Sequence, residues 1–132
     1  MKKLVQWGAG NIGRSFIGQI FARCGYEVTF IDIDKTLIEL LNRSRCYQVV
    51  TVSQKGETCY DIEGIRAIYG GDEDQVQEAV RETDLLSVSV GKDVLVRIAE
   101  QLAQCLIHRY AYRPNCPLDV IIAENIHQGA QY

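Results

Sequence analysis

The sequence predicts an α/β domain built on a doubly wound, mainly parallel sheet with an inserted β-hairpin. Three observations support this fold class. A strand, a glycine turn and a helix follow one another within residues 4–18, a carboxylate ends the next β-rich run, and β-rich and helical runs alternate along most of the remaining chain. The length of 132 residues is that of one domain. We therefore expect residues 1–132 to form a single domain.

The first element is a strand that leads directly into a glycine-rich turn. Residues 3–7 are largely apolar, and the next six residues have the G-x-G-x-x-G spacing of dinucleotide-binding loops. These six residues are Gly8, Ala9, Gly10, Asn11, Ile12 and Gly13. We expect Gly8 to allow the tight turn, Gly10 to let the backbone approach a pyrophosphate, and Gly13 to let the helix pack on the strand. A turn of purely structural purpose is the alternative, but the flanking strand and helix favour a dinucleotide site and a Rossmann-type fold.

A helix and a second strand complete the first parallel unit. Residues 11–24 form an amphipathic run that ends before Gly25, a residue suited to the left-handed cap conformation. The expected apolar side of this helix consists of Ile12, Phe16, Ile17, Ile20 and Phe21. Residues 27–33 are β-branched and aromatic, as in a buried strand. The resulting strand–helix–strand unit is expected to be a right-handed crossover between parallel strands.

Asp32 stands at the end of the second strand, nineteen residues after Gly13. A carboxylate near this position binds the adenosine ribose hydroxyls in dinucleotide-binding folds. It also repels the 2′-phosphate of NADP, and no arginine follows immediately to attract one, so the sequence favours NAD. The alternative for Asp32 is a helix cap, but Asp34 is better placed to cap the helix predicted over residues 35–42.

The remaining chain alternates between β-rich and helical runs, with one interruption. Residues 47–53 and 58–62 flank a glycine-containing turn and predict a hairpin inserted beside the sheet. Further strands are predicted at residues 64–69, 84–90 and 118–123, further helices from Asp72 onward and over residues 92–108, and a proline-containing loop at residues 111–117. The carboxyl ends of parallel strands share one edge, so Gly91 and the pair Glu124-Asn125 are expected near the glycine turn.

The helix predicted over residues 92–108 has an apolar stripe at helical spacing. The stripe consists of Val94, Leu95, Ile98, Ala99, Leu102, Ala103 and Leu106. His108 and Arg109 belong to the last turn, where positive charge suits the negative end of the helix dipole.

Composition and charge argue against several classes of protein. The net charge of -3 and the lack of basic runs give no reason to expect a nucleic-acid partner. No apolar stretch approaches the roughly 20 residues that span a membrane, and the N-terminus lacks the apolar core of a signal peptide. The five cysteines include no C-x-x-C pair, which predicts reduced and mostly buried thiols, no metal site and a cytoplasmic location.

Several motifs together resemble one enzyme family. They are the GAGNIGR-x-FIG string at residues 8–18, the strand that ends at Asp32, Ser-Val-Gly at residues 89–91 and Ala-Glu-Asn at residues 123–125. In order and spacing they are similar to the N-terminal domain of the polyol-specific long-chain dehydrogenases, over essentially the whole chain. The resemblance implies NAD as the cofactor and hydride transfer between a polyol phosphate and a sugar phosphate.

The resemblance also implies roles for individual residues. The backbone of the glycine turn would bind the pyrophosphate, Asp32 the adenosine ribose, and Val90 and Gly91 the region of the nicotinamide ribose. Glu124 and Asn125 would line the cofactor, and Asn125 would polarise the substrate carbonyl, where an amide N–H stabilises the developing negative charge. A cap for a following helix is an equal alternative for Asn125.

A second domain is expected from the same resemblance. Members of the family continue into a helical C-terminal domain that carries the catalytic lysine, so we expect this chain to bind NAD but to lack turnover alone. Apolar surface that the second domain would cover is expected to make the fragment self-associate. Two alternatives stay open: a hexuronate reductase of the same family, whose substrate contacts would lie in the other domain, and a module that senses NAD occupancy.

Overall fold

The computed structural model describes residues 1–124, and in this part of the chain the centre of the protein is a five-stranded parallel sheet. The strands lie in the order β5-β2-β1-β6-β7, and every pairing between neighbours is parallel. Their bounds are β1 Lys3–Trp7, β2 Glu27–Asp32, β5 Ile65–Tyr69, β6 Leu85–Val88 and β7 Asp119–Ile122. The strand order reverses direction at β1, as it does in doubly wound sheets, so the predicted fold class is confirmed.

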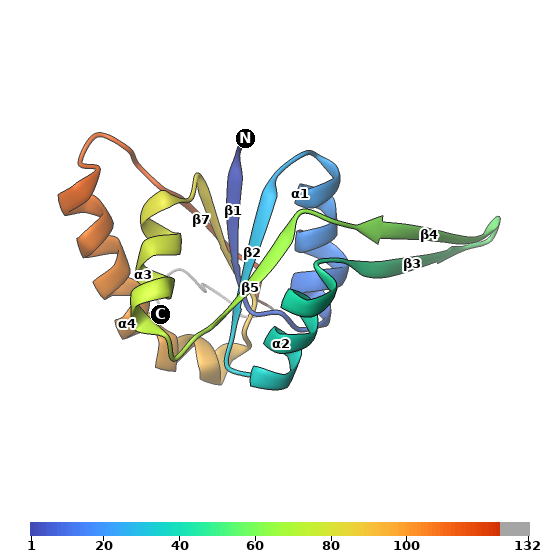
Figure 1. Ribbon diagram of the computed structural model, residues 1–132, viewed down its shortest axis with the longest axis horizontal. Coiled ribbons are helices and arrows are strands. Elements are labelled where there is room, and N and C mark those ends of the chain that lie inside the picture. Colours follow the sequence, from blue (N-terminus) through green and yellow to red (C-terminus); the bar gives the residue numbers. More distant parts are fainter. Residues whose placement is uncertain (125–132) are drawn as a thin grey trace.

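Helices cover both faces of this sheet. Figure 1 shows α1 and α2 on one side of the strands and α3 and α4 on the other. The helical segments are η1 Gly13–Gly18, α1 Gln19–Arg23, α2 Lys35–Ser44, α3 Glu73–Glu82 and α4 Lys92–Tyr112. Asp34 and Asp72 cap α2 and α3 as predicted, since their carboxylates accept from main-chain N–H groups of the first turn at 3.2 and 3.3 Å.

Side chains that alternate along the strands build one core on each face. Leu4 and Phe30 belong to the core beneath α1 and α2, whereas Val5 and Trp7 belong to the core beneath α3 and α4. All four side chains are at most 2% exposed. The apolar character of the β1 run follows from burial on both faces, which is the usual situation of a central parallel strand.

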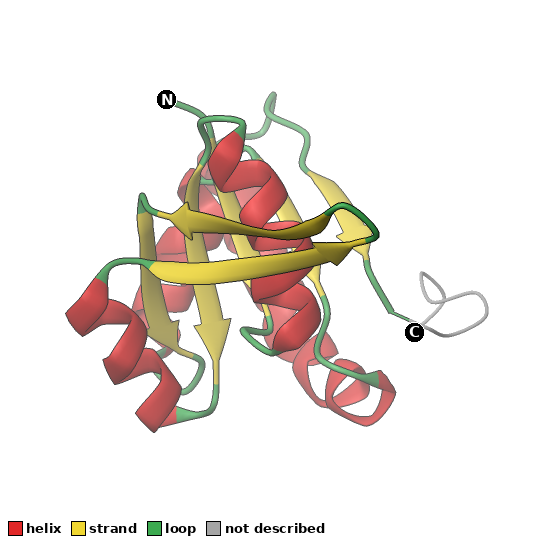
Figure 2. Cartoon of the chain, turned by 90° about the vertical axis from the view of Figure 1, so that its right-hand side faces the viewer, coloured by secondary structure: helices red, strands yellow, loops and turns green. Residues whose placement is uncertain are grey.

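The hairpin of β3 Tyr47–Ser53 and β4 Gly56–Ile62 is a separate antiparallel sheet. It projects from the body on the side of α1 and α2 (Figure 1), and its strands run across those of the main sheet in the side view (Figure 2). Val49 and Ile62 are buried and attach the base of the hairpin to the core beneath α1 and α2. The predicted insertion beside the sheet is therefore confirmed.

The helix after the glycine turn differs from the regular helix predicted over residues 11–24. It contains the π-helical segment η1, and α1 restores the α-helical spacing from Gln19 onward. Ile17 is buried, but Ile12, Phe16 and Ile20 are 52%, 55% and 39% exposed. The prediction of an inward apolar side is wrong for these three residues. A π turn closes five residues along the chain, so it shifts the helix out of the 3.6-residue register on which the prediction depended.

The helix α4 extends four residues beyond its predicted end and reaches Tyr112. Arg109 is 4% exposed, and its guanidinium donates to the main-chain oxygens of Val80, Arg81 and Thr83 at 2.9, 2.9 and 2.7 Å. These carbonyls belong to the end of α3, where a helix leaves acceptors unpaired. The Arg109 side chain therefore caps the C-terminus of α3 rather than that of its own helix. Ala103, predicted in the core stripe, is exposed.

The cysteines are also less buried than predicted. Cys105 is buried in α4, whereas the other four cysteines are exposed. The exposed ones are Cys24, Cys46, Cys59 and Cys116. They lie at the end of a helix, in the hairpin region and in a loop, away from both cores. All five are free thiols.

Over residues 1–124, no helix has both the length and the apolar character needed to cross a membrane.

Candidate dinucleotide-binding site

The carboxyl ends of β1, β2 and β6 hold the glycine turn between them. The N–H of Gly8 donates to the Ile31 carbonyl at 2.7 Å, and the N–H of Ser89 donates to the Trp7 carbonyl at 2.9 Å. Gly8 has a φ of 105°, and a Cβ atom at this position would overlap the Ser89 carbonyl. Both the backbone angle and the close approach of β6 therefore require glycine here.

Gly10 and Gly13 have contrasting surroundings. A Cβ atom on Gly13 would overlap the carbonyl oxygen of Gly8, so the absence of a side chain lets the first helical turn pack on the glycine turn. A Cβ atom on Gly10 would meet nothing within 4 Å. The space in front of Gly10 is open, and the first N–H groups of a helix, which lack intrahelical partners, follow directly. These features fit a diphosphate group.

A buried glutamine braces the turn from within β1. Gln6 is fully buried, and its Nε2 donates to the Ser89 hydroxyl at 2.7 Å and to the Gly8 carbonyl at 3.1 Å. The side chain therefore connects the glycine turn to the segment that follows β6. Gln6 is not among the residues predicted from the sequence. The available signal was a polar residue inside an apolar strand, two positions before the first glycine, because such a group is buried only with partners.

Asp32 lies at the end of β2 with its carboxylate beside the glycine turn. One oxygen accepts from the N–H of Ala9 at 2.8 Å, and the other accepts from the N–H of Asp34 at 2.9 Å. An ionised carboxylate accepts about four hydrogen bonds, so both oxygens retain capacity for ribose hydroxyls. The helix-cap alternative for Asp32 is not what the structure shows, since Asp34 is the residue that caps α2.

An apolar cleft of about 170 Å³ adjoins the Asp32 carboxylate. Its walls come from β1, β2, the loop after β6 and the first turns of α4. The wall residues are Trp7, Ile31, Ile33, Val90, Val94 and Ile98, and Gly8, Gly10, Asp32 and Ser89 form the polar rim. Ile33 is 67% exposed, so a large apolar side chain is available to a ligand. A cleft with apolar walls and a few polar groups at its rim suits a purine base joined to a ribose.

The loop between β6 and α4 is held by Glu124. The Glu124 carboxylate accepts from the N–H of Val90 at 2.5 Å and from the N–H of Gly91 at 3.0 Å. Gly91 is the N-cap residue of α4, where negative charge is stabilised by the helix dipole. The structure thus brings Val90, Gly91 and Glu124 to the edge that carries the glycine turn, with Glu124 directed at the main chain of the loop. Asn125 lies outside the described residues.

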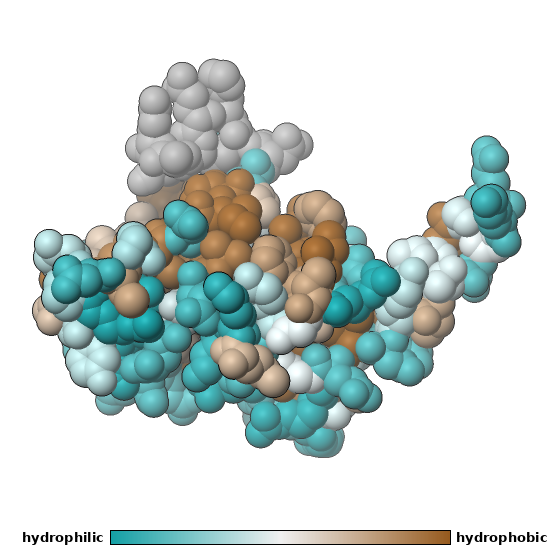
Figure 3. All heavy atoms as spheres, turned by 90° about the horizontal axis from the view of Figure 1, so that it is seen from above, coloured by the Kyte–Doolittle hydropathy of each residue, from teal (hydrophilic) through white to brown (hydrophobic). Residues whose placement is uncertain are grey.

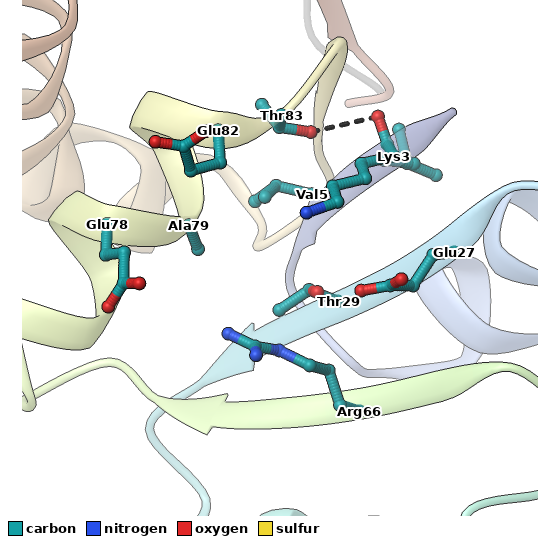
Figure 4. Close-up of a pocket in the computed structure, with 10 residues that line it drawn as sticks. Lys3, Val5, Glu27, Thr29, Arg66, Glu78, Ala79, Glu82 and Thr83 are labelled. Atoms are coloured by element: carbon teal, nitrogen blue, oxygen red, sulfur yellow. Dashed lines mark hydrogen bonds between the residues drawn. The ribbon is translucent and has the colours of Figure 1, made fainter. Parts of the chain in front are cut away.

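A second pocket lies among β1, β2, β5 and α3, near the amino ends of the strands (Figure 4). Its volume is about 70 Å³, and charged side chains of both signs line it, including Lys3, Glu27 and Arg66. The Thr83 hydroxyl donates to the Lys3 carbonyl at 3.0 Å and closes one side. This pocket contains neither the glycine turn nor Asp32, so the candidate dinucleotide site is the one at the carboxyl edge.

The fold agrees with the comparisons to known proteins. The family described as "Mannitol dehydrogenase Rossmann domain" matches residues 2–132. The chain is 39% identical to the mannitol-1-phosphate 5-dehydrogenase of Brevibacillus brevis over 96% of its length and 32% of the relative. It is 38% identical to that of Thermoanaerobacter pseudethanolicus, over 95% of this chain and 32% of the relative. For Lactococcus lactis the identity is 35%, over 100% of this chain and 34% of the relative.

The extent of these matches defines which part of the relatives the chain corresponds to. The chain spans about a third of the length of the relatives it matches. The glycine turn, the parallel sheet and the match over residues 2–132 all concern the same stretch. Together they show that this chain belongs to the mannitol dehydrogenase family, of which it is the Rossmann domain.

Proposed function

We propose that this chain binds NAD(H) as the cofactor domain of an oxidoreductase that interconverts mannitol 1-phosphate and fructose 6-phosphate. The observation that supports NAD binding is the union of three features at one edge of the sheet: the open face of Gly10, the Asp32 carboxylate and the apolar cleft. The names of the relatives support the choice of substrate.

Different residues of the site contact different parts of the cofactor. Asp32 accepts hydrogen bonds from the adenosine ribose, the main chain of residues 10–13 binds the diphosphate, and the cleft beside Ile33 receives the adenine. Val90 and Gly91 line the nicotinamide ribose, with Glu124 fixing their loop. Bound NAD supplies the hydride acceptor.

The chemistry at the substrate is proposed to involve Asn125 and sequence beyond this stretch. We propose that the Asn125 amide stabilises the negative charge that develops on the substrate oxygen, since an amide N–H is a neutral donor. Because the relatives are about three times as long, we propose that their further domain supplies the group that transfers the proton, and that this chain alone binds the cofactor without turnover. Free thiols at all five cysteines suit a reducing compartment, and we propose the cytoplasm.

Replacing Asp32 by asparagine should weaken NAD binding by about 10- to 100-fold, because hydrogen bonds to a charged acceptor are lost. It should also narrow the preference for NAD over NADP, since the negative charge that repels a 2′-phosphate is removed. Isothermal titration of the wild-type chain and the variant with both cofactors measures the two effects. A wild-type chain that binds neither cofactor, or that binds NADP more tightly, would contradict the proposed function.

The matched control for this experiment is Asp34→Asn. Asp34 lies two residues away and caps α2 by accepting from the N–H of Leu37 at 3.2 Å. Asparagine caps helices about as well as aspartate, so the fold should be unchanged. The affinity for NAD should also be unchanged. An equal loss of affinity in both variants would mean that general negative charge, rather than the Asp32 carboxylate, is responsible.

We also propose that the isolated chain self-associates through its exposed apolar side chains, with a second copy covering them. Exposed apolar residues recur every four positions from Ile12, just before η1, to Phe16 in η1 and Ile20 in α1. Figure 3 shows apolar residues gathered in the centre of the face seen from above. Exposed apolar surface of this kind usually marks a contact between proteins.

Sedimentation velocity over a concentration series should therefore show dimers or larger species of the wild-type chain. Phe16→Ser should shift the distribution towards monomer, because Phe16 is the largest side chain of the stripe. Val52→Ser, at an exposed position near the tip of the hairpin, is the control and should have little effect. A wild-type chain that stays monomeric at every concentration would refute self-association.

A further inference from the structure

Tyr47 connects the hairpin to the glycine turn through a single residue. Its hydroxyl donates to the main-chain oxygen of Arg14 at 2.6 Å. The N–H of the same Arg14 donates to the carbonyl oxygen of Gly10 at 3.0 Å. Gly10 is the residue whose open face receives the diphosphate in the proposed function. Two hydrogen bonds in series therefore join the first residue of β3 to the turn that binds phosphate.

The surroundings of the Tyr47 ring fix the position of its hydroxyl. The ring packs edge-on against Phe30, with centroids 5.9 Å apart and planes at 66°. A Cβ atom on Gly18 would lie 2.7 Å from the Phe30 ring and 2.8 Å from the Tyr47 hydroxyl, so only glycine lets the phenol reach η1. Burial raises the pKa of the Tyr47 phenol, against a smaller opposite effect of Arg14, and the hydroxyl therefore remains a donor at neutral pH.

Among the helical segments of residues 1–124, the contact falls on the one whose geometry is unusual. η1 is π-helical, and such segments are rare, short and often located at functional sites. A Cβ atom on Gly18 would also lie 2.6 Å from the Gly13 carbonyl oxygen, so the five-residue turn itself depends on glycine at this end. The bond from the Arg14 N–H to Gly10 spans four residues, as in an α-helix, so the Tyr47 hydroxyl donates to a residue at which α-helical and π-helical spacing meet.

We propose that Tyr47 is a positioning residue for the diphosphate of the cofactor. Its hydroxyl holds the Arg14 main chain, and thereby residues 10–13, in the orientation that receives the phosphates. This inference rests on the proposed NAD binding and adds to it a role for the hairpin. The hairpin supports the phosphate-binding turn from the side opposite the ligand, without contacting the cofactor.

The test is Tyr47→Phe, which removes the hydroxyl but keeps the ring that packs on Phe30. The variant should bind NAD and ADP roughly three- to tenfold more weakly, the effect of one lost hydrogen bond. Its affinity for adenosine, which lacks phosphate, should equal that of the wild-type chain. A general loosening of the fold would weaken all three ligands alike, and that result would overturn the proposal. So would unchanged affinity for NAD and ADP.

The matched control is Tyr60→Phe, on the other strand of the hairpin. The Tyr60 ring stacks under the Arg23 guanidinium, 3.8 Å from its centroid, so this variant removes a hydroxyl while the ring contact remains. Its affinities for NAD, ADP and adenosine should all match the wild-type values. A wild-type chain that does not bind NAD would refute the proposed function, whereas equal behaviour of the two phenylalanine variants would refute only the role of Tyr47.

Hydrogen–deuterium exchange of the wild-type chain gives a second measurement that does not depend on any variant. Saturating NAD should slow exchange in residues 10–14 and also at the start of β3, because the hydrogen bonds through Arg14 couple the two segments. The far end of the hairpin, around Gly56, should not change. Protection of the glycine turn with none at the start of β3 would contradict the proposed coupling.

Discussion

Replacing Arg109 by methionine should lower the free energy of unfolding by about 3–5 kcal/mol. Methionine preserves much of the apolar stem but leaves the carbonyls of Val80 and Thr83 without their charged donor, while the Arg81 carbonyl keeps only Arg113. Two of these three contacts are buried, so water cannot replace the guanidinium there. Burial lowers the pKa of Arg109, yet an arginine stays charged in proteins, and the hydrogen bonds remain charge-assisted.

Thermal and denaturant unfolding of the purified chain would measure this loss, with a fall of roughly 10 °C or more in melting temperature. Arg113→Met is the matched control, one helical turn later. Arg113 donates to the Arg81 carbonyl at 3.1 Å and is more exposed, so its loss should cost less than about 1 kcal/mol. Similar stabilities of the two variants would mean that capping of α3 contributes little.

Replacing Gly10 by alanine should weaken NAD binding and leave the stability of the fold nearly unchanged. Its Cβ atom would meet no protein atom within 4 Å, so the free energy of unfolding should change by no more than about 0.5 kcal/mol. The same methyl group would occupy the space in front of the turn, and NAD affinity should fall at least about tenfold. Calorimetric titration and thermal unfolding of one sample measure both quantities.

Alanine at Gly13 should impair both properties. Its Cβ atom would overlap the Gly8 carbonyl and lie 3.1 Å from the Gln6 side chain. The Gly8 backbone cannot move away without opening the glycine turn. We expect a loss of about 1–3 kcal/mol in the free energy of unfolding and no measurable NAD binding. Wild-type affinity in the Gly10 variant would place the diphosphate elsewhere. Wild-type stability in the Gly13 variant would contradict the close packing of the turn.

The sequence was sufficient for the features that depend on local pattern. Alternating runs predicted the sheet, and the two aspartates ahead of α2 and α3 predicted their caps because an N-cap acts within one turn of chain. The glycine turn and Asp32 lie together at the carboxyl edge of the sheet because neighbouring parallel strands end at the same edge. These features follow from short-range rules and the handedness of the crossover.

The features that the sequence did not predict depend on distant partners. Arg109 donates to carbonyl oxygens that lie 26 to 29 residues earlier in the sequence, and Gln6 donates to the Ser89 hydroxyl, 83 residues later. No periodicity in either segment indicates such pairs. The π-helical segment η1 likewise has distant neighbours, since Tyr47 and Phe30 approach Gly18 from the hairpin and from β2. The exposure of Ile12 and Phe16 follows from that geometry and could not be deduced from helical spacing.

The position of β1 at the middle of the sheet has a consequence for how the domain is synthesised. Of the five strands of the sheet, β1 leaves the ribosome before the other four, and its neighbour β2 follows soon after. Its other neighbour, β6, pairs Leu4 with Leu85 and arrives some eighty residues later. Contacts so distant in sequence close late in folding. Gly8 lies against the Ser89 carbonyl, so the glycine turn acquires its final shape only after β6 has joined the sheet. During translation the nascent chain therefore carries its most recognisable motif long before that motif has its folded form.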